Sequence, residues 1–117
     1  MVKVLIKKLN PDVQIPKYKT EGASGVDLKA FINEPIKLAP NKSCLVPTGL
    51  SVAFSDDYEI QIRPRSGLAA KNNISVLNTP GTIDSDYRGE IKIILFNHGS
   101  SDFTISNKDR IAQMILM

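Results

Sequence analysis

One short segment of the sequence, Asn78–Glu90 (NTPGTIDSDYRGE), concentrates side chains that could carry out chemistry on a small molecule. It places Asp84, Tyr87 and Arg88 beside a Pro-Gly turn and between two apolar runs. A carboxylate can hold and deprotonate a water molecule, and a tyrosine ring can stack on a sugar or a base. The segment is far longer than a tight turn needs, and long irregular connections on a sheet often carry binding sites. A solvated turn is the alternative interpretation.

A second segment, Ile62–Lys71 (IRPRSGLAAK), predicts an anion site at the start of a short helix. Ser66 is the predicted N-cap of this helix, which should end at Asn72-Asn73. The first backbone amides of a helix have no internal acceptor and point outward, so they attract anions. Arg65 could grip two oxygens, and Gly67 would let a ligand approach the backbone closely. The alternative is a capped surface helix with a charged neighbour.

Two further segments hold polar side chains at the edges of predicted strands. Gly22–Ala30 (GASGVDLKA) places Asp27 among small residues that allow tight backbone packing. Asn107–Leu116 (NKDRIAQMIL) carries Arg110 and Gln113, which are three residues apart. Because a regular strand alternates its faces, these two side chains are predicted to lie on opposite faces and need not act together. Each segment alone is compatible with an ordinary turn and strand.

The elements that would position these side chains are short strands, separated by turn residues about every eight to twelve positions. Strands are predicted at Val2–Ile6, Ser43–Val46, Leu50–Phe54, Glu59–Arg63, Ile74–Leu77, Ile91–Phe96 and Ile111–Leu116. This spacing is typical of an antiparallel sandwich or jelly roll. In Glu59–Arg63 the alternation is strict, which predicts one buried and one solvated face. We therefore expect a compact all-β domain with one short helix.

The composition restricts the class of protein. With 117 residues and 42% hydrophobic residues, the chain should form a single packed domain, residues 1–117. No apolar run approaches the roughly 20 residues of a membrane span, and the segment Met1–Lys8 lacks the core of a signal peptide. One cysteine, Cys44, and one histidine, His98, are too few for a zinc site or a histidine-activated nucleophile, and His98 fits a turn. We expect a cytoplasmic protein that does not bind a membrane.

The charge distribution favours a phosphate ligand without requiring one. The net charge is +3 and the isoelectric point is about 9.1, which is a mild excess. The lysines are scattered, whereas the arginines all lie in the second half of the chain, at Arg63, Arg65, Arg88 and Arg110. The planar guanidinium group matches pairs of phosphate oxygens.

Taken together, the four segments resemble the four ordered motifs of the trimeric dUTPase family, the deoxyuridine triphosphate nucleotidohydrolases. The matching stretches are ASGVDLKA, RPRSGLAAK, NTPGTIDSDYRGEI and DRIAQMIL, and they span nearly the whole chain. The resemblance implies a jelly-roll or distorted β-barrel fold, and a homotrimer whose active sites are shared between subunits. It also implies hydrolysis of dUTP to dUMP and pyrophosphate, with Mg²⁺ bound mainly by the triphosphate. Such an activity limits uracil incorporation into DNA and supplies dUMP for dTMP synthesis.

The resemblance assigns roles to individual residues. Asp84 matches the carboxylate that activates the attacking water, and Tyr87 matches the ring under deoxyribose, which excludes a 2′-hydroxyl. The residues expected to contact the nucleoside are Asn78, Gly81, Thr82, Ile83, Asp84, Tyr87 and Lys92. The residues expected near the phosphates are Arg65, Ser66, Gly67, Arg110 and Gln113. Asp27 is expected to support the metal indirectly, through water.

The resemblance departs from the family pattern at one place. The family usually ends with a glycine-rich arm, Arg-x-Gly-Ser-Thr-Gly, that closes over the phosphates, and this motif is not found up to Met117. In the absence of such an arm we expect weaker ordering of the phosphates and slower turnover.

Three alternatives remain open at this point. A dCTP deaminase shares the fold, but that group carries a glutamate after the aromatic residue, where Arg88 follows Tyr87 here. A module that binds single-stranded nucleic acid would present several stacking aromatics in a basic groove, whereas the aromatics here are dispersed. A jelly-roll protein with an inactive site is the third. We expect dUTP as the partner, and neither nucleic acid nor membrane.

Overall fold

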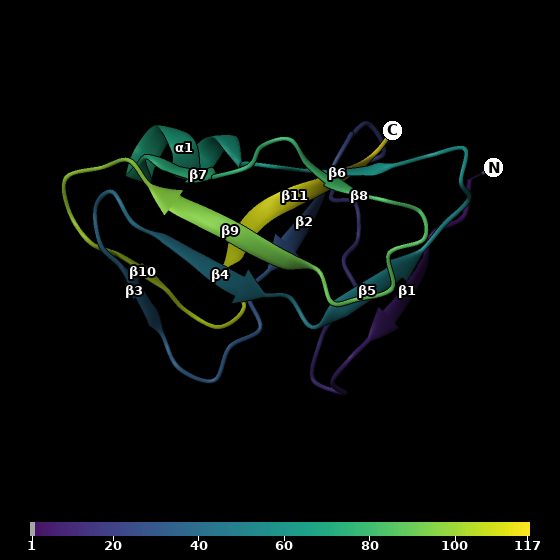
Figure 1. The fold of residues 1–117 in the computed structure, drawn as a ribbon, viewed down its shortest axis with the longest axis horizontal. Coiled ribbons are helices and arrows are strands. Elements are labelled where there is room, and N and C mark those ends of the chain that lie inside the picture. Colours follow the sequence, from purple (N-terminus) through teal and green to yellow (C-terminus); the bar gives the residue numbers. More distant parts are fainter. Residues whose placement is uncertain (1) are drawn as a thin grey trace.

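The computed structural model describes residues 2–117 and consists mostly of β-strands, with one short helix (Figure 1). The strands are β1 (Leu5–Lys8), β2 (Val26–Lys29), β3 (Ile36–Leu38), β4 (Ser43–Pro47), β5 (Leu50–Ala53), β6 (Ile60–Arg63), β7 (Ile74–Val76), β8 (Gly81–Ile83), β9 (Lys92–Asn97), β10 (Phe103–Ile105) and β11 (Arg110–Leu116). The helix α1 covers Ser66–Asn72. The expectation of a mostly β domain with one short helix is confirmed.

The strands form four open antiparallel sheets. The two larger sheets have the strand orders β2-β11-β6-β8 and β4-β9-β7, and β1-β5 and β10-β3 form two separate two-stranded sheets. The central strands of the larger sheets, β9 and β11, contact each other, and Figure 1 shows β9 crossing β11. These sheets do not join into a closed barrel within the described residues, so the expectation of a distorted β-barrel is not met.

The core lies between the inner faces of these sheets. In β6 the burial alternates strictly, with Ile60 and Ile62 buried, as the sequence pattern predicts. In β9 the buried positions are Ile93, Leu95 and Asn97. Burial of each of the isoleucine and leucine side chains contributes about 1.5–3 kcal/mol. The alternation therefore holds both strands in register and fixes the loops at their ends.

The N-cap of α1 lies one residue earlier in the chain than the sequence pattern predicts. The N-cap is Arg65, with extended φ and ψ of −83° and 129°, and Ser66 is the first helical residue, which corrects the prediction of Ser66 as the cap. Pro64 precedes the cap, and the Arg65 side chain is engaged in ion pairing rather than in capping. The last helical residue is Asn72, and the C-cap is Asn73, whose left-handed φ of 58° lets its amide reach the carbonyl of Ala69.

The segment Asn78–Glu90 is not a simple connection between two paired strands. β7 pairs with β9, as expected for its flanking strands, but β8 within the segment pairs with β6 in the other large sheet. The segment therefore crosses from one sheet to the other and back.

The one helix in residues 2–117 is not long and apolar enough to span a bilayer.

Candidate functional site

The predicted site residues fall into two groups in the structure. The first, which we call the arginine cluster, consists of Asp27, Arg65, Arg110 and Gln113 at the junction of β2, β6, β11 and α1. The second surrounds a cavity of about 440 Å³ beside β8 and β9, which we call the β8–β9 pocket.

The arginine cluster is organised around one carboxylate. The Nε of Arg65 donates to Oδ1 of Asp27 at 3.2 Å, and the Nη1 of Arg110 lies 3.6 Å from Oδ2. Each oxygen of Asp27 therefore faces a different guanidinium group. Two positive charges against one negative leave the cluster with an excess positive charge, and the three side chains remain partly exposed, at 23–40%. Such a cluster can accept an anion without first breaking its internal ion pairs.

A β-bulge brings Arg110 and Gln113 to the same face of β11. In the pairing with β2, Arg110 lies opposite Lys29, Ala112 opposite Leu28, and Gln113 opposite Asp27, so one additional residue is inserted between Arg110 and Ala112. An inserted residue shifts the alternation of faces by one position. The prediction that Arg110 and Gln113 lie on opposite faces is therefore wrong. The bulge could not be seen in a pattern that assumed a regular strand.

Gln113 is held in place by its neighbours. Its Nε2 donates to the carbonyl of Pro64 at 3.0 Å. A Cβ on Gly25 would lie 2.5 Å from Oε1 of Gln113, so only glycine leaves room for this amide. The side chain of Gln113 is thus tied directly to the residue that precedes the N-cap of α1.

The start of α1 is open toward the outside. Ser66 and Gly67 are exposed, and nothing lies within 4 Å of the position where a Cβ of Gly67 would be. The first amide that bonds within the helix is that of Ala69, to the carbonyl of Arg65 at 3.1 Å. The preceding amides therefore have no acceptor within the helix, and they can serve an anion.

A larger basic cavity adjoins the arginine cluster. Its volume is about 1070 Å³, and Asp27 and Arg110 form part of its wall. Its other charged residues are Lys8, Asp12, Lys17, Lys19, Lys29 and Lys108. The excess of lysines raises the local concentration of anions near the cluster.

The β8–β9 pocket gathers every residue that was predicted to contact a nucleoside. These are Asn78, Gly81, Thr82, Ile83, Asp84, Tyr87 and Lys92. The pocket is also lined by Glu90 and by an apolar wall that includes Leu45, Ile62 and Ile94, none of which was predicted from the sequence. No sequence signal marked Leu45, which lies in the continuous apolar run Cys44–Val46 and is 55% exposed in the structure. The pocket combines backbone polar groups with an apolar wall, as small-molecule sites do.

Asp84 lies exposed at the mouth of this pocket. It follows the last residue of β8, and its backbone carbonyl accepts a hydrogen bond from the amide of Tyr87 at 3.0 Å. Within residues 2–117 its carboxylate accepts no hydrogen bond. Both oxygens are therefore available to water or ligand.

A thiol nucleophile and a preformed metal site find no support among residues 2–117. Cys44 is partly buried, and this burial raises the pKa of its thiol, which disfavours the nucleophilic thiolate. His98 directly follows β9, where its amide donates to the carbonyl of Asn73 at 2.9 Å, and its ring bonds to the hydroxyl of Ser75 at 2.7 Å. The described residues contain no group of three His, Cys, Asp or Glu side chains arranged to hold a metal ion.

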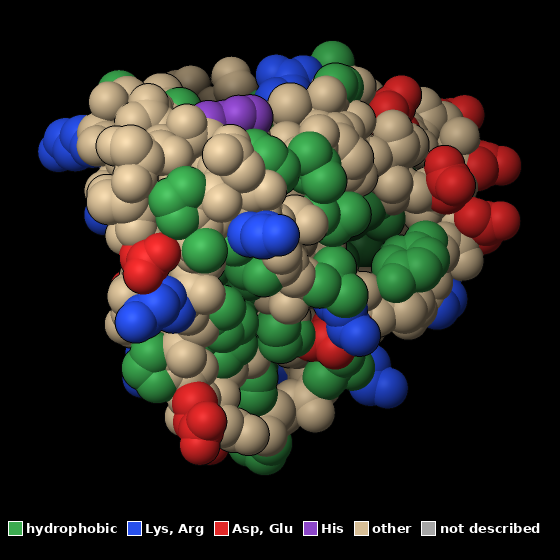
Figure 2. Space-filling model, turned by 60° about the vertical axis from the view of Figure 1, so that its left-hand side comes forward, with side chains coloured by type: hydrophobic (Ala, Val, Ile, Leu, Met, Phe, Trp, Pro, Cys, Tyr) green, Lys and Arg blue, Asp and Glu red, His purple; other side chains and the backbone are tan. Residues whose placement is uncertain are grey.

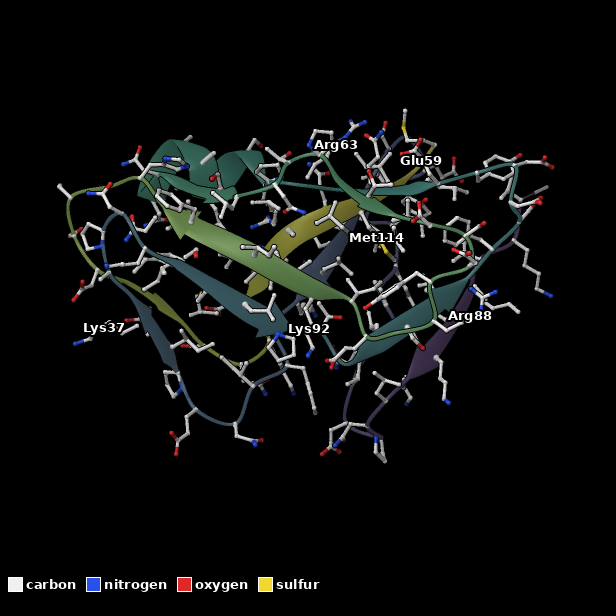
Figure 3. All side chains as sticks on the ribbon, viewed as in Figure 1. Lys37, Glu59, Arg63, Arg88, Lys92 and Met114 are labelled. Atoms are coloured by element: carbon white, nitrogen blue, oxygen red, sulfur yellow. The ribbon has the colours of Figure 1, made fainter. Side chains whose placement is uncertain are left out.

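The two groups lie at opposite ends of β6. Ile83 pairs with Ile60, so Asp84 lies beyond one end of β6, whereas Arg65 follows the other end. Ile60 and Arg65 are five residues apart, which is roughly 16 Å of extended chain. In Figure 3, Glu59 and Arg63 mark the two ends of β6, and Arg88, in the same turn as Asp84, lies well away from Arg63. Within one chain, Asp84 and Arg65 are therefore held apart by the length of β6.

The outer face of the β4-β9-β7 sheet, next to the β8–β9 pocket, is apolar. Leu45 pairs with Ile94, and Leu77, which is 51% exposed, bonds through its amide to the carbonyl of Ile94. Hydrophobic side chains spread over one face of the molecule and line a hollow (Figure 2). In this row Leu45 and Leu77 are exposed and Ile94 is partly buried. A row of apolar side chains of this kind on a sheet is typical of a surface that another protein surface covers.

Comparisons with known proteins agree with the arrangement of the motifs. The dUTPase family model matches residues 11–117. Deoxyuridine 5'-triphosphate nucleotidohydrolase from Treponema denticola is 57% identical over 109 residues, which cover 93% of this chain and 76% of the relative. The enzyme of the same name from Fusobacterium nucleatum is 52% identical over 117 residues, covering 99% of this chain and 80% of the relative.

Solved structures show the same fold at low sequence identity. A dUTPase mutant from phage phi11 of S. aureus, described as coordinating a structural Mg(II) ion, superposes with a TM-score of 0.88 at 18% identity. The match covers 98% of this chain and 90% of that protein. The dUTPase of Staphylococcus phage 80alpha superposes equally well, with a TM-score of 0.88 at 19% identity and coverage of 98% and 89%.

Proposed function

The chain belongs to the dUTPase family, and we propose that it hydrolyses dUTP to dUMP and pyrophosphate in the β8–β9 pocket. The observation that carries this proposal is the lining of that pocket. All seven residues assigned to the nucleoside by the family motifs meet around one cavity, with a free carboxylate at its mouth.

The pocket can distinguish uracil from the other bases. The backbone of Gly81–Ile83 is fixed by its pairing with β6, so its amides and carbonyls have set directions. Uracil presents an acceptor, a donor and an acceptor at O4, N3–H and O2, whereas cytosine reverses part of this pattern. Each buried polar group left unpaired by cytosine costs about 1–3 kcal/mol. Thymine carries an additional methyl group that would meet the wall of the segment Asn78–Glu90.

Asp84 supplies the base for the chemical step. Its carboxylate holds one water molecule by a hydrogen bond and takes a proton from it as the water oxygen attacks the α-phosphorus. The bond from the α-phosphorus to the bridging oxygen breaks, and pyrophosphate leaves with the electron pair. The Asp84 carboxylate can align the water because no residue within 2–117 donates a hydrogen bond to this carboxylate.

The arginine cluster and the start of α1 bind the phosphate chain. Arg65 and Arg110 supply positive charge, the amides of Ser66 and Gly67 supply donors, and Gln113 supplies an amide group. The internal pairing with Asp27 keeps both guanidinium groups oriented before the ligand arrives. Oriented donors of this kind stabilise the charge that develops on the leaving pyrophosphate.

The donor set fits a magnesium ion that is held mainly by substrate. Mg²⁺ in such sites keeps several waters and is bound by one or two carboxylates together with phosphate oxygens. Asp27 is the carboxylate near the expected phosphates, and it would accept hydrogen bonds from the waters of the ion rather than contact it. When bound, the ion would neutralise part of the phosphate charge.

This reaction is proposed for the cytoplasm, since the free Cys44 suits a reducing compartment.

The proposal includes a homotrimer with active sites shared between copies. It is supported by the distance along β6 between Asp84 and Arg65, which exceeds what one α-phosphate can bridge. It is also supported by the apolar row of exposed Leu45 and Leu77 and partly buried Ile94, of which Leu45 and Ile94 line the pocket. A cyclic assembly would place the start of α1 from one copy against the β8–β9 pocket of the next, and bury this row.

Replacement of Tyr87 by alanine is expected to weaken the exclusion of ribonucleotides. The ring of Tyr87 forms one side of the β8–β9 pocket, where a 2′-hydroxyl would collide with it. In the Tyr87→Ala variant, kcat/KM for UTP relative to dUTP should rise by about tenfold or more. Steady-state kinetics with both nucleotides measures this ratio. An unaltered ratio would remove Tyr87 from sugar discrimination.

Pyrophosphate release from dUTP, UTP, dCTP and dTTP in the presence of Mg²⁺ tests the proposed function as a whole. Release from dUTP should dominate strongly over release from the other three. Formation of dUTP from dCTP would instead indicate a deaminase. Tight binding of a dUTP analogue without any release from dUTP would indicate an inactive nucleotide-binding protein.

A further inference from the structure

The side chain of Tyr87 is folded over its own turn in a way that depends on Gly89. The hydroxyl of Tyr87 donates to the backbone carbonyl of Glu90 at 2.9 Å. A Cβ on Gly89 would lie 2.5 Å from the Tyr87 hydroxyl oxygen, 2.7 Å from Cζ and 3.1 Å from Cε1. These distances are far below van der Waals contact, so a side chain at position 89 cannot coexist with the observed ring.

The requirement for glycine at position 89 comes from space rather than from the backbone. Gly89 does not have a positive φ, in contrast to Gly49, whose φ is 71°. An alanine could therefore adopt the backbone of Gly89 without strain. The group that must move is the ring of Tyr87, which is 45% exposed and has open space available on its solvent side.

The acceptor of the tyrosine hydroxyl is itself fixed. The carboxylate of Glu90 accepts a hydrogen bond from the amide of Gly49 at 2.9 Å. The amide of Ile91 donates to the carbonyl of Leu50 at 2.8 Å, and the carbonyl of Ile91 accepts from the hydroxyl of buried Thr48 at 2.6 Å. The amide of Thr48 also donates to the carbonyl of Ile91, at 3.2 Å. Four hydrogen bonds thus attach Glu90 and Ile91 to the turn at Thr48–Leu50, between β4 and β5.

We propose that Gly89 is a specificity-determining residue: its lack of a side chain admits the Tyr87 ring to the fixed position from which it rejects ribose. This inference rests on the proposed function, in which Tyr87 lies beneath deoxyribose. To make room for a 2′-hydroxyl the ring would have to break its hydrogen bond to the Glu90 carbonyl, whereas a ring already displaced by a Cβ would leave that volume free. Gly89 acts through Tyr87 and does not itself contact the nucleotide.

The Gly89→Ala variant tests this inference directly. The ratio of kcat/KM for UTP to that for dUTP should rise by about tenfold, with the melting temperature close to that of the parent protein. The matched control is Gly22→Ala, because no atom lies within 4 Å of the position where a Cβ of Gly22 would be. This control should leave both the ratio and the melting temperature unchanged.

A double-mutant comparison distinguishes positioning from a general structural effect. The Gly89→Ala change made in a Tyr87→Ala background should add little to the ratio, because the ring through which Gly89 acts is absent. If Gly89→Ala alone lowers the melting temperature, the double variant should recover it, since the collision has been removed. Additive effects on the ratio, or no recovery of stability, would overturn the inference.

The failure of this inference can be told apart from failure of the proposed role of Tyr87. If Tyr87→Ala raises the ratio and Gly89→Ala does not, only the inference about Gly89 is wrong. If Tyr87→Ala leaves the ratio unchanged, the proposed contact between Tyr87 and the sugar is wrong, and the inference about Gly89 falls with it.

Discussion

Replacing Asp84 by asparagine should lower kcat for dUTP hydrolysis by about 10²–10⁴-fold, while the affinity for dUTP changes by no more than about twofold. Asparagine has the same shape as aspartate, but it cannot take the proton of the attacking water. The carboxylate of Asp84 accepts no hydrogen bond from residues 2–117, so the fold does not depend on it. The effect should therefore appear in turnover rather than in binding or stability.

Single-turnover pyrophosphate release and binding of an unhydrolysable dUTP analogue measure the two quantities for Asp84→Asn separately. Asp86→Asn is the matched control, because Asp86 is an exposed acid of the same turn that does not line the β8–β9 pocket. It should keep the activity of the parent protein. A kcat for Asp84→Asn within about threefold of the parent would exclude Asp84 as the base.

Replacing Arg65 by alanine should lower kcat/KM for dUTP by about 10²–10³-fold. The guanidinium group of Arg65 is oriented by Asp27 at the start of α1, so its loss removes both a phosphate contact and the partner of Asp27. The remaining carboxylate would then face only Arg110 and would repel the phosphates more strongly.

Steady-state kinetics of Arg65→Ala should be compared with those of Arg63→Ala. The guanidinium group of Arg63 bonds to Oε1 of Gln61 at 2.7 Å and lies outside the arginine cluster. Arg63→Ala should therefore leave kcat/KM nearly unchanged. Equal losses in the two variants would mean that general positive charge, rather than a specific contact of Arg65, supports the reaction.

Local patterns in the sequence predicted a large part of the fold. The strict alternation of Glu59–Arg63 predicted the buried face of β6, and the helix Ser66–Asn72 followed from its composition and from the two asparagines that end it. Unlike the equally short β7, which belongs to the predicted run Ile74–Leu77, the three-residue strands β3, β8 and β10 were not predicted, because each lies next to proline or other turn residues. Their existence depends on pairing with distant strands.

The two groups of site residues were also predicted, but not their geometry. The family motifs selected the residues that line the β8–β9 pocket, and Asp27 was placed near Arg65 only by the fold. The bulge in β11 and the fit of Tyr87 against Gly89 are consequences of three-dimensional packing. A linear pattern that assumes regular strands contains neither of them.

The most direct measurement of the central claim is complementation between two inactive variants. The claim is that the β8–β9 pocket of one copy and the arginine cluster of another act on the same triphosphate. Asp84→Asn and Arg65→Ala would be unfolded, mixed in equal amounts and refolded together, with the parent protein refolded in the same way as reference. A site is intact when its pocket comes from an Arg65→Ala copy and its arginine cluster from an Asp84→Asn copy.

With random mixing, about half of the copies can supply an intact pocket and about half an intact arginine cluster, so we expect recovery of about one quarter of the parent activity. Each variant refolded alone should stay nearly inactive. If the activity of the mixture is no greater than the average of the two separate variants, each chain supplies both groups to its own site. That result would contradict a site shared between copies.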